Sequence, residues 1–376
     1  MSNSRKGAKE LFEDVIDQGL CIGCGACVTA CPYIVAYEGK IVVLDKCTIA
    51  EGDCYKHCPR TYMDMNAVSE KIFGVPYGDE EVGHAFDIYM ARSKDTEIRE
   101  KAQDGGTVTT LLALALEEGM IDAIVCTKMD EEKIARGYIA RSREQLLQCA
   151  GSSYEASFAL EAYRTIPKEN TEKLAVVGLG CQVEAVSKIK SDPAKNSVNP
   201  GNIKLTFGLF CGWALRPDIF HPYLRKLCDP SQAVKFDIPH TPHYTFDVYT
   251  KSDTKSVSLD DIRPYINPAC RYCWDLTAEF SDISVGSAGS AFPGWNTVII
   301  RTKGGADLVG LAKARGILET QALPDQRLAH LKTVALKRKK AALKNIVEKS
   351  GNKKDLLYVG GLPEGIADRL LADYSE

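Results

Sequence analysis

The chain has 376 residues, 45% hydrophobic and 26% charged, which is enough for two or three folded units around a buried core. Its 47 Lys and Arg against 50 Asp and Glu give a formal net charge of -3, so no basic excess points to nucleic acid as a partner. No apolar run approaches the roughly 20 residues that span a bilayer, and the N-terminus lacks the pattern of an export signal. We therefore expect a cytoplasmic protein without a membrane span.

The first feature along the chain is a dense group of cysteines. Seven of the 14 cysteines lie between residues 21 and 58. Residues 21–32 read CIGCGACVTACP, the C-x2-C-x2-C-x3-C-P run with which bacterial ferredoxins hold iron–sulfur clusters. In a reducing compartment such clustered thiolates indicate metal binding rather than disulfides. A zinc site is the alternative, although zinc favours separated CxxC pairs.

The spacing assigns these cysteines to two clusters. In a two-cluster ferredoxin the last cysteine of the second half-motif, here Cys58 before Pro59, completes the first cluster. The ligands expected for the first 4Fe-4S cluster are therefore Cys21, Cys24, Cys27 and Cys58. The second cluster is left with Cys31, Cys47 and Cys54. It is short of one cysteine, so a non-cysteine ligand, a missing iron or a thiolate from elsewhere in the chain would be needed.

Beyond the turn-rich segment VPYGDEE at 75–81, strand-like and helix-like runs alternate. We expect strands at 85–92, 121–128, 173–180, 203–210, 282–287 and 296–302. We expect helices at 107–119, 156–166, 181–190, 216–228, 305–316 and about 325–350. This alternation predicts an α/β core with a largely parallel sheet, interrupted by a hairpin insertion at about 244–262. The basic run LKRKKAALK at 336–344 predicts a solvated helix face.

These patterns predict three parts. Residues 1–75 form a small ferredoxin-like α+β domain, residues 76–350 form the α/β domain, and residues 351–376 form a C-terminal segment.

Four later cysteines share one context. Cys181 and Cys211 each follow a predicted strand, and Cys270 and Cys273 form a CxxC pair. Since the carboxyl ends of parallel strands meet at one edge of a sheet, these four thiolates can converge there and suit another cluster. A zinc site or a redox disulfide is the alternative for the CxxC pair. The lone cysteines are expected to pack as small apolar residues: Cys126, Cys149 and Cys228.

Glycine-rich turns offer candidate cofactor contacts. QDGGTVTTLL at 103–112 places two glycines before a predicted helix, where free N–H groups would fit a phosphate or the polar rim of a flavin. GSSY at 151–154 also precedes a predicted helix, and an ordinary loop is the alternative for both. GLGC at 178–181 lacks the third glycine of a dinucleotide fingerprint, so we exclude a standard Rossmann site. His240 and His243 are expected in a surface loop, with metal ligation as the alternative.

In this order, six motifs closely resemble the beta-subunit family of coenzyme F420-reducing hydrogenases and dehydrogenases, over roughly residues 18–305: CIGCGACVTACP, QDGGTVTTLL, GLGCQ, LFCGW, CRYCWD and SDISVGS. With its two-cluster segment, the chain is most similar to the beta subunit of F420-linked formate dehydrogenases and to the electron-input subunit of dehydrogenases that oxidise reduced coenzyme F420. The resemblance implies FAD and a 4Fe-4S cluster in the α/β core, two or three clusters in all, and coenzyme F420 as the substrate.

The resemblance also implies particular site residues. The core-cluster ligands would be Cys181, Cys211, Cys270 and Cys273. Flavin contacts would come from Gly105, Gly106 and Thr107, and the second glycine turn adds the candidates Gly151, Ser152 and Tyr154. The chain departs from the family pattern at the shortened second half-motif and at Asp104, which replaces a serine common before the glycine pair.

The function implied by this resemblance is electron transfer between coenzyme F420 and a partner, the catalytic subunit of a formate dehydrogenase or hydrogenase within a larger complex. Because clusters carry single electrons and a deazaflavin takes a hydride, a flavin must stand between them. We expect no catalytic side-chain acid or base. The alternatives are a reductase of another acceptor and a non-catalytic electron-transfer adaptor.

Overall fold

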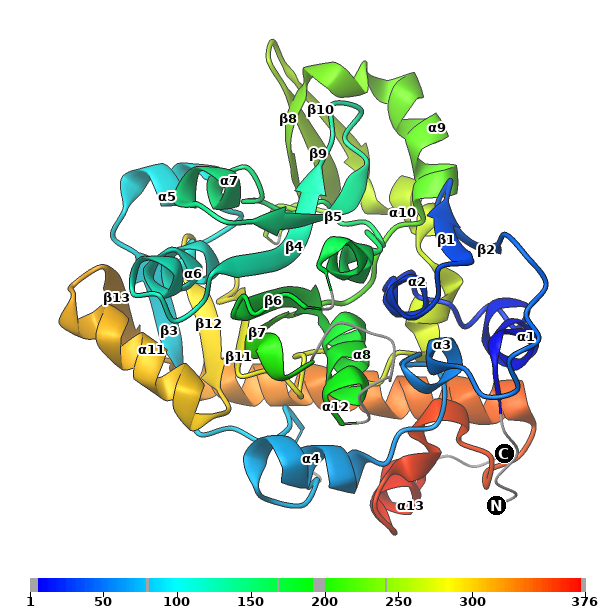
Figure 1. Cartoon of the computed structure of the whole chain (residues 1–376). Helices are drawn as coiled ribbons and strands as arrows, with labels where there is room; N and C mark the ends of the chain where they lie inside the picture. The colour runs from blue at the N-terminus through cyan, green and yellow to red at the C-terminus, as the bar shows by residue number, and fades with distance from the viewer. Residues whose placement is uncertain (1–5, 79–80, 168, 192–199, 241, 373–376) are drawn as a thin grey trace.

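The computed structural model describes residues 6–78, 81–167, 169–191, 200–240 and 242–372. At its centre lies an eight-stranded sheet in the order β13-β3-β12-β11-β7-β6-β4-β5 (Figure 1). In chain order these strands are β3 Asp87–Ser93, β4 Ala123–Met129, β5 Ala135–Ala140, β6 Leu174–Leu179, β7 Ile203–Leu209, β11 Ile283–Ser287, β12 Asn296–Ile300 and β13 Leu318–Ala322.

The predicted α/β class is confirmed, with the parallel strands at the centre of the sheet. β11, β7, β6 and β4 pair in parallel. The outer pairings, β4 with β5 and those among β11, β12, β3 and β13, are antiparallel. All six predicted core strands are present within a few residues, whereas the edge strands β5 and β13 were not predicted. Both edges are polar and partly exposed, so their hydrophobic signal is weak.

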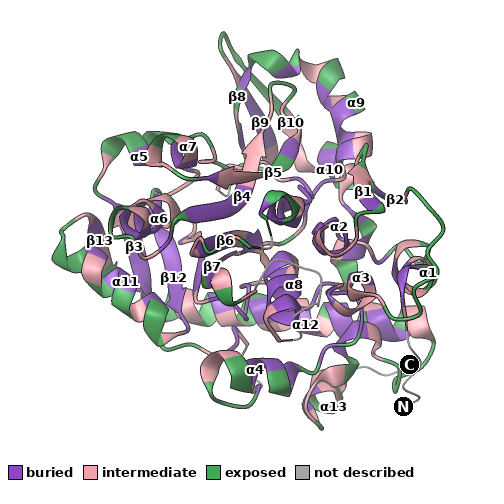
Figure 2. Ribbon diagram, viewed as in Figure 1, coloured by how far each residue is buried: buried purple, intermediate pink, exposed green. Residues whose placement is uncertain are grey.

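Helices cover both faces of this sheet, as the buried central strands in Figure 2 show. One face packs against α6 Thr107–Glu117 and α11 Lys303–Ala314. The other packs against α8 Gly180–Ser191 and the long helix α12 Asp325–Ser350. Successive strand residues alternate between the faces: Ile124 joins the α6 side and Val125 the α8 side. The shorter helices are α5 Thr96–Lys101, α7 Arg143–Leu147, α9 Pro217–Leu227, α10 Leu259–Ile262 and α13 Ile366–Leu371.

The prediction of a helix over the whole of residues 156–166 is wrong. The chain forms only a 3-10 helix, Ala159–Thr165, after an extended stretch. In that stretch the Ala156 N–H donates to the Leu215 carbonyl at 2.9 Å and the Phe158 N–H donates to the Gly23 carbonyl at 2.9 Å. These tertiary hydrogen bonds take the place of the first helical turn.

The N-terminal module consists of short elements: α1 Ala8–Leu11, a π-helical turn Phe12–Ile16, α2 Ala26–Ala30, the hairpin β1 Ile34–Tyr37 and β2 Lys40–Val43, and α3 Asp53–Lys56. α2 packs against α8 and against the 3-10 helix that follows residue 158. α4 Met65–Phe73 and the segment after α12 share one buried cluster with α12 itself. The boundaries at 75 and 350 fall just after α4 and at the end of α12, and the domain division itself stays a prediction.

Where the hairpin insertion was predicted, β9 Thr245–Thr250 and β10 Thr254–Ser258 pair antiparallel, with a third strand, β8 Ala233–Asp237, beside β9. Among the described helices, none combines the length and the apolar character needed to cross a bilayer.

Candidate electron-transfer site

The first cysteine set surrounds one cavity. Its lining includes Cys21, Cys24, Cys27 and Cys58, together with Pro59 and Arg60. Gly25 begins α2 with a φ of 86°, and a Cβ there would lie 2.7 Å from the Phe158 carbonyl oxygen, so only glycine fits. The Ala26 N–H points at the Cys24 Sγ at 3.5 Å. The predicted set is therefore brought together.

The chemistry of this cavity fits a cubane. Burial raises the pKa of Cys21 to about 11 and that of Cys24 further, because a bare thiolate is costly away from water. Cluster iron would hold these sulfurs as thiolates, and an N–H donor to sulfur is typical of cluster sites. Within the described residues, no three His, Cys, Asp or Glu side chains surround the position of a single metal ion. A cubane instead places each thiolate on a separate iron.

The second N-terminal set also lies together. Burial raises the pKa of Cys54 to about 12, and the neighbouring Cys31 and Cys47 add to the rise. Cys54 is buried, Cys31 half-buried and Cys47 exposed. The second cluster would therefore be the more exposed of the two N-terminal clusters.

The core cysteines converge as the strand order predicts. β6 and β7 pair in parallel with Leu179 opposite Leu209, and Cys181 and Cys211 each follow two residues later. Cys270 lies in a 3-10 helix, Pro268–Tyr272, and accepts a hydrogen bond at 3.4 Å from the Ala214 N–H. Burial raises the pKa of Cys211 well above its ordinary value, with Cys270 and Cys273 close enough to add to the rise. This site also fits a cubane.

The basic run on α12 reaches this core site, so its prediction as a solvated face is wrong for two residues. Arg338 donates from Nε to the Cys273 carbonyl at 2.8 Å and from Nη2 to the Cys270 carbonyl at 2.7 Å. Lys339 is 3% exposed and pairs with Glu279 at 2.8 Å. α12 lies across the sheet, which buries one side of the run against carbonyls and a carboxylate that the sequence pattern does not reveal.

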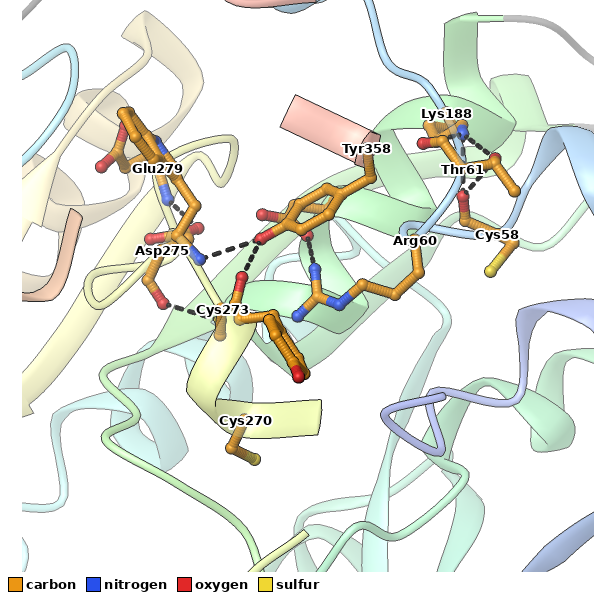
Figure 3. A network of polar contacts seen from close by, with 12 residues as sticks. Cys58, Arg60, Thr61, Lys188, Cys270, Cys273, Asp275, Glu279 and Tyr358 are labelled. Carbon is orange, nitrogen blue, oxygen red and sulfur yellow. Dashed lines mark hydrogen bonds and ion pairs between the residues drawn. The ribbon is translucent and has the colours of Figure 1, made fainter. Parts of the chain in front are cut away.

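Figure 3 shows a polar network between the two cysteine sets. Arg60 pairs with Glu184 at 3.1 Å, and both side chains are at most 1% exposed. Burial raises the pKa of Glu184 to about 8 and lowers the pKa of Lys188 to about 8. Lys188 donates to the Cys58 carbonyl at 2.8 Å and to the Thr61 hydroxyl at 2.7 Å. Arg60, Glu184 and Lys188 were not singled out from the sequence, because their role depends on tertiary packing.

A second link between the two sets runs through Asn267. Its Nδ2 donates to the Cys21 carbonyl at 3.1 Å. Its Oδ1 accepts from the Ala269 N–H at 3.0 Å and so caps the 3-10 helix that carries Cys270. The two cysteine sets are thus joined through the hydrogen bonds of the Asn267 side chain.

The first glycine turn is explained by packing. A Cβ on Gly105 would lie 2.8 Å from the Asn296 Oδ1 and 2.9 Å from the Ala91 carbonyl oxygen. Thr107 is fully buried; its N–H donates to Asn296 and its hydroxyl donates to the Ala91 carbonyl, both at 3.2 Å. Gly106 has a φ of 72° at the start of α6. The turn therefore fixes α6 against β3 and β12, and its flavin contacts stay a prediction.

The second glycine turn meets further polar residues. Gly151 has a φ of 100° and Tyr154 a φ of 59°, a conformation that costs strain in a non-glycine residue. The Tyr154 hydroxyl accepts from the Ile238 N–H at 3.2 Å. Two residues on, His240 lies in a loop, as predicted, with its side chain one-third exposed and 3.5 Å from Asp104, and His243 is exposed.

Asp104 is the centre of this polar group. Burial raises its pKa, while the neighbouring His240 and the hydroxyl of Ser287 oppose the rise. Ser287 ends β11 and belongs to the SDISVGS motif. Residues from four segments thus meet at the carboxyl edge of the parallel strands. No sequence pattern indicated that Asp104, His240 and Ser287 would be neighbours.

Comparison with known families supports this picture. The model described as coenzyme F420 hydrogenase/dehydrogenase, beta subunit, matches in its N-terminal part over residues 88–164 and in its C-terminal part over residues 171–326. A 4Fe-4S binding domain matches residues 14–33.

Several relatives are similar over most of the chain. The coenzyme F420 hydrogenase beta subunit of Methanosarcina barkeri is 34% identical over 66% of this chain and 85% of its own length, and that of Methanothermobacter thermautotrophicus is 33% identical over 69% and 93%. A coenzyme F420-dependent sulfite reductase of Methanocaldococcus jannaschii is 30% identical over 85% of this chain, which spans 51% of that reductase. A chain in the structure of the F420-reducing NiFe hydrogenase complex of Methanosarcina barkeri superposes with a TM-score of 0.65 and 29% identity, over 71% of this chain and 93% of that one. The chain therefore belongs to the coenzyme F420 hydrogenase/dehydrogenase beta-subunit family and carries a 4Fe-4S binding domain at its N-terminus.

Proposed function

We propose that this chain is an iron–sulfur flavoprotein subunit that transfers electrons between coenzyme F420 and a partner, the catalytic subunit of a formate dehydrogenase or hydrogenase. The observation that carries the proposal is the placement of two partly buried four-cysteine sets side by side in a chain of this family, joined through Arg60 and Asn267. A chain of linked clusters is what single-electron transport across a protein requires.

The N-terminal module is proposed as the electron port. The first cluster would be held by Cys21, Cys24, Cys27 and Cys58, and the second would draw on Cys31, Cys47 and Cys54. Because Cys47 is exposed, the second cluster would lie toward the protein surface, where a partner subunit can approach. The core cluster would be held by Cys181, Cys211, Cys270 and Cys273.

FAD is proposed at the carboxyl edge of the parallel strands. The candidate contacts are Gly105, Gly106, Thr107, Gly151, Ser152 and Tyr154, joined by Asp104 and Ser287. A bound flavin supplies the exchange between single electrons and a hydride. The strained Tyr154 backbone aims the phenol at the Ile238 N–H, which holds the loop in place beside Asp104. His240, whose side chain is one-third exposed, lies on the solvent side of Asp104, which is less exposed.

The test is reduction of coenzyme F420 by the anaerobically purified and reconstituted chain, with reduced methyl viologen as the one-electron donor. Flavin, iron and sulfide are counted in the same sample. We expect stoichiometric flavin and steady reduction of the deazaflavin. Cys211→Ser should abolish the reduction. The matched change Cys228→Ser, at a cysteine that belongs to none of the three sets, should preserve it.

Each failure has its own meaning. Full iron and sulfide without flavin would contradict the flavoprotein assignment and favour an electron-transfer adaptor. Stoichiometric flavin and iron without reduction of coenzyme F420 would favour a different acceptor, and a screen of two-electron acceptors with the same donor would then identify it.

A further inference from the structure

Arg60 spans the space between the two four-cysteine sets. It follows Cys58 by two residues and lines the cavity of the first set. Its guanidinium lies 4.3 Å from the centre of the Tyr358 ring. The Tyr358 hydroxyl accepts from the Trp274 N–H at 2.9 Å and donates to the Tyr272 carbonyl at 2.8 Å, so this ring is fastened to both residues that flank Cys273. Figure 3 shows Arg60 extending from the Cys58 side toward Cys273.

The hydrogen-bonding capacity of Arg60 is largely unused. Its side chain is 0% exposed, and Nη1 donates to the Glu184 carboxylate at 3.1 Å. Nε and Nη2 have no hydrogen-bond partner among the described residues. A buried guanidinium with unsatisfied N–H groups is costly, since both its charge and its donors have left water. Such donors indicate that an acceptor belongs in the space between the cysteine sets.

The charge of Arg60 reaches both sets. Arg60 lines the cavity of the first set, and Cys273 and Cys181 of the core set lie close enough to act electrostatically on its guanidinium. A cluster with four thiolate ligands is anionic and gains one further negative charge on reduction. A cation at this position therefore favours the reduced form of a cluster on either side.

We propose that Arg60 is a positioning residue shared by the first N-terminal cluster and the core cluster, donating hydrogen bonds to cluster sulfur and raising both reduction potentials together. The inference rests on the proposed function in so far as both cysteine sets bind clusters. The step it serves moves one electron from one cluster to the other, with no bond made or broken and no proton transferred. Because one cation shifts both potentials in the same direction, it changes the free-energy difference between the clusters less than a cation beside one cluster alone would.

Two other cations, the buried Lys188 and the half-buried Arg338, act on one side only and provide matched controls. Lys188 donates to the carbonyls of Cys58 and Tyr62 at 2.8 and 2.9 Å, on the side of the first set. Arg338 donates to the carbonyls of Cys270 and Cys273, on the side of the core set.

The experiment is an anaerobic redox titration of the reconstituted full chain, with each cluster followed by its electron paramagnetic resonance signal. The variants are Arg60→Met, Arg60→Lys, Lys188→Met and Arg338→Met. Arg60→Met should lower both midpoint potentials, so that at a fixed solution potential the ratio of reduced to oxidised cluster falls about tenfold, equivalent to about 59 mV for a one-electron couple. Lys188→Met should shift only the first cluster, and Arg338→Met only the core cluster. Arg60→Lys, which keeps the charge but not the planar fork, should shift both clusters downward by less.

A shift confined to one cluster in the Arg60 variants, or no shift at full iron content, would overturn the inference and leave the proposed function standing. An iron count for the unchanged chain that allows a cluster in only one of the two sets would overturn both. If Arg60→Met fails to retain iron, Arg60→Lys decides: a joint downward shift supports the shared role, and any other pattern contradicts it.

Discussion

Asn267 offers a sharp test of the contact between the two cluster sites. It is 7% exposed and makes two side-chain hydrogen bonds, one to the Cys21 carbonyl and one from the Ala269 N–H. Asn267→Ala removes both. The capping bond is worth about 1 kcal/mol, and leaving the part-buried Cys21 carbonyl without its donor costs about 1–3 kcal/mol. We therefore expect the free energy of unfolding to fall by about 2–4 kcal/mol.

The assay is denaturant unfolding of the anaerobic holoprotein, followed by circular dichroism and by cluster absorbance. Asn267→Ser can keep the cap while losing the reach to Cys21, so it should recover about 1 kcal/mol of the loss. Asn345→Ala is the matched control, because Asn345 bonds to the Arg271 carbonyl of the same segment at 2.9 Å but in an exposed position. It should cost under about 0.5 kcal/mol.

Equal stability of the Asn267→Ser and Asn267→Ala variants would refute the claim that the capping bond and the bond to the Cys21 carbonyl contribute separately to stability. A loss at Asn267→Ala no larger than at Asn345→Ala would refute the claim that this side chain joins the sites.

Three further outcomes are expected. Gly25→Ala should prevent assembly of the first cluster, measured as a drop in iron content, because the new Cβ would lie 2.7 Å from the Phe158 carbonyl oxygen. The control is Gly19→Ala, at a residue with a φ of 68° and nothing within 4 Å of the added Cβ. It should cost about 1 kcal/mol of stability and leave the iron content unchanged. Cys273→Ala should remove the core cluster and with it reduction of coenzyme F420, while the flavin remains extractable; loss of neither would contradict the ligand assignment. Asp104→Asn should remove from the pH profile of that reduction an ionisation above the ordinary carboxyl value of 3.8, since burial raises the pKa of Asp104; an unchanged profile would contradict its place at the reaction site.

The strands and the core cysteines could be predicted because their signals are local. Buried central strands are continuous apolar runs, and residues that follow neighbouring parallel strands must meet at one edge. Cys181 and Cys211 were placed in this way, two residues beyond paired positions of β6 and β7. The spacing of the ferredoxin motif was enough to predict which four cysteines would line one cavity, Cys21, Cys24, Cys27 and Cys58.

The remaining features depend on tertiary partners. The segment before Ala159 is extended because Phe158 bonds to Gly23, more than 100 residues away in the chain. Arg338 and Lys339 belong to a run with the composition of a solvated face, and only the position of α12 beneath the sheet buries them. Arg60, which follows the motif directly, carries no sequence signal that separates it from a surface arginine.

The most direct test of the central claim is an anaerobic titration of the reconstituted chain with reduced coenzyme F420. Flavin and cluster absorbance are followed together with the band of the oxidised deazaflavin. The account predicts that flavin and clusters bleach in step as that band grows, because the hydride enters the flavin and its electrons pass singly into the clusters. A protein that holds stoichiometric flavin and iron, yet shows no change in any of these bands, would contradict it.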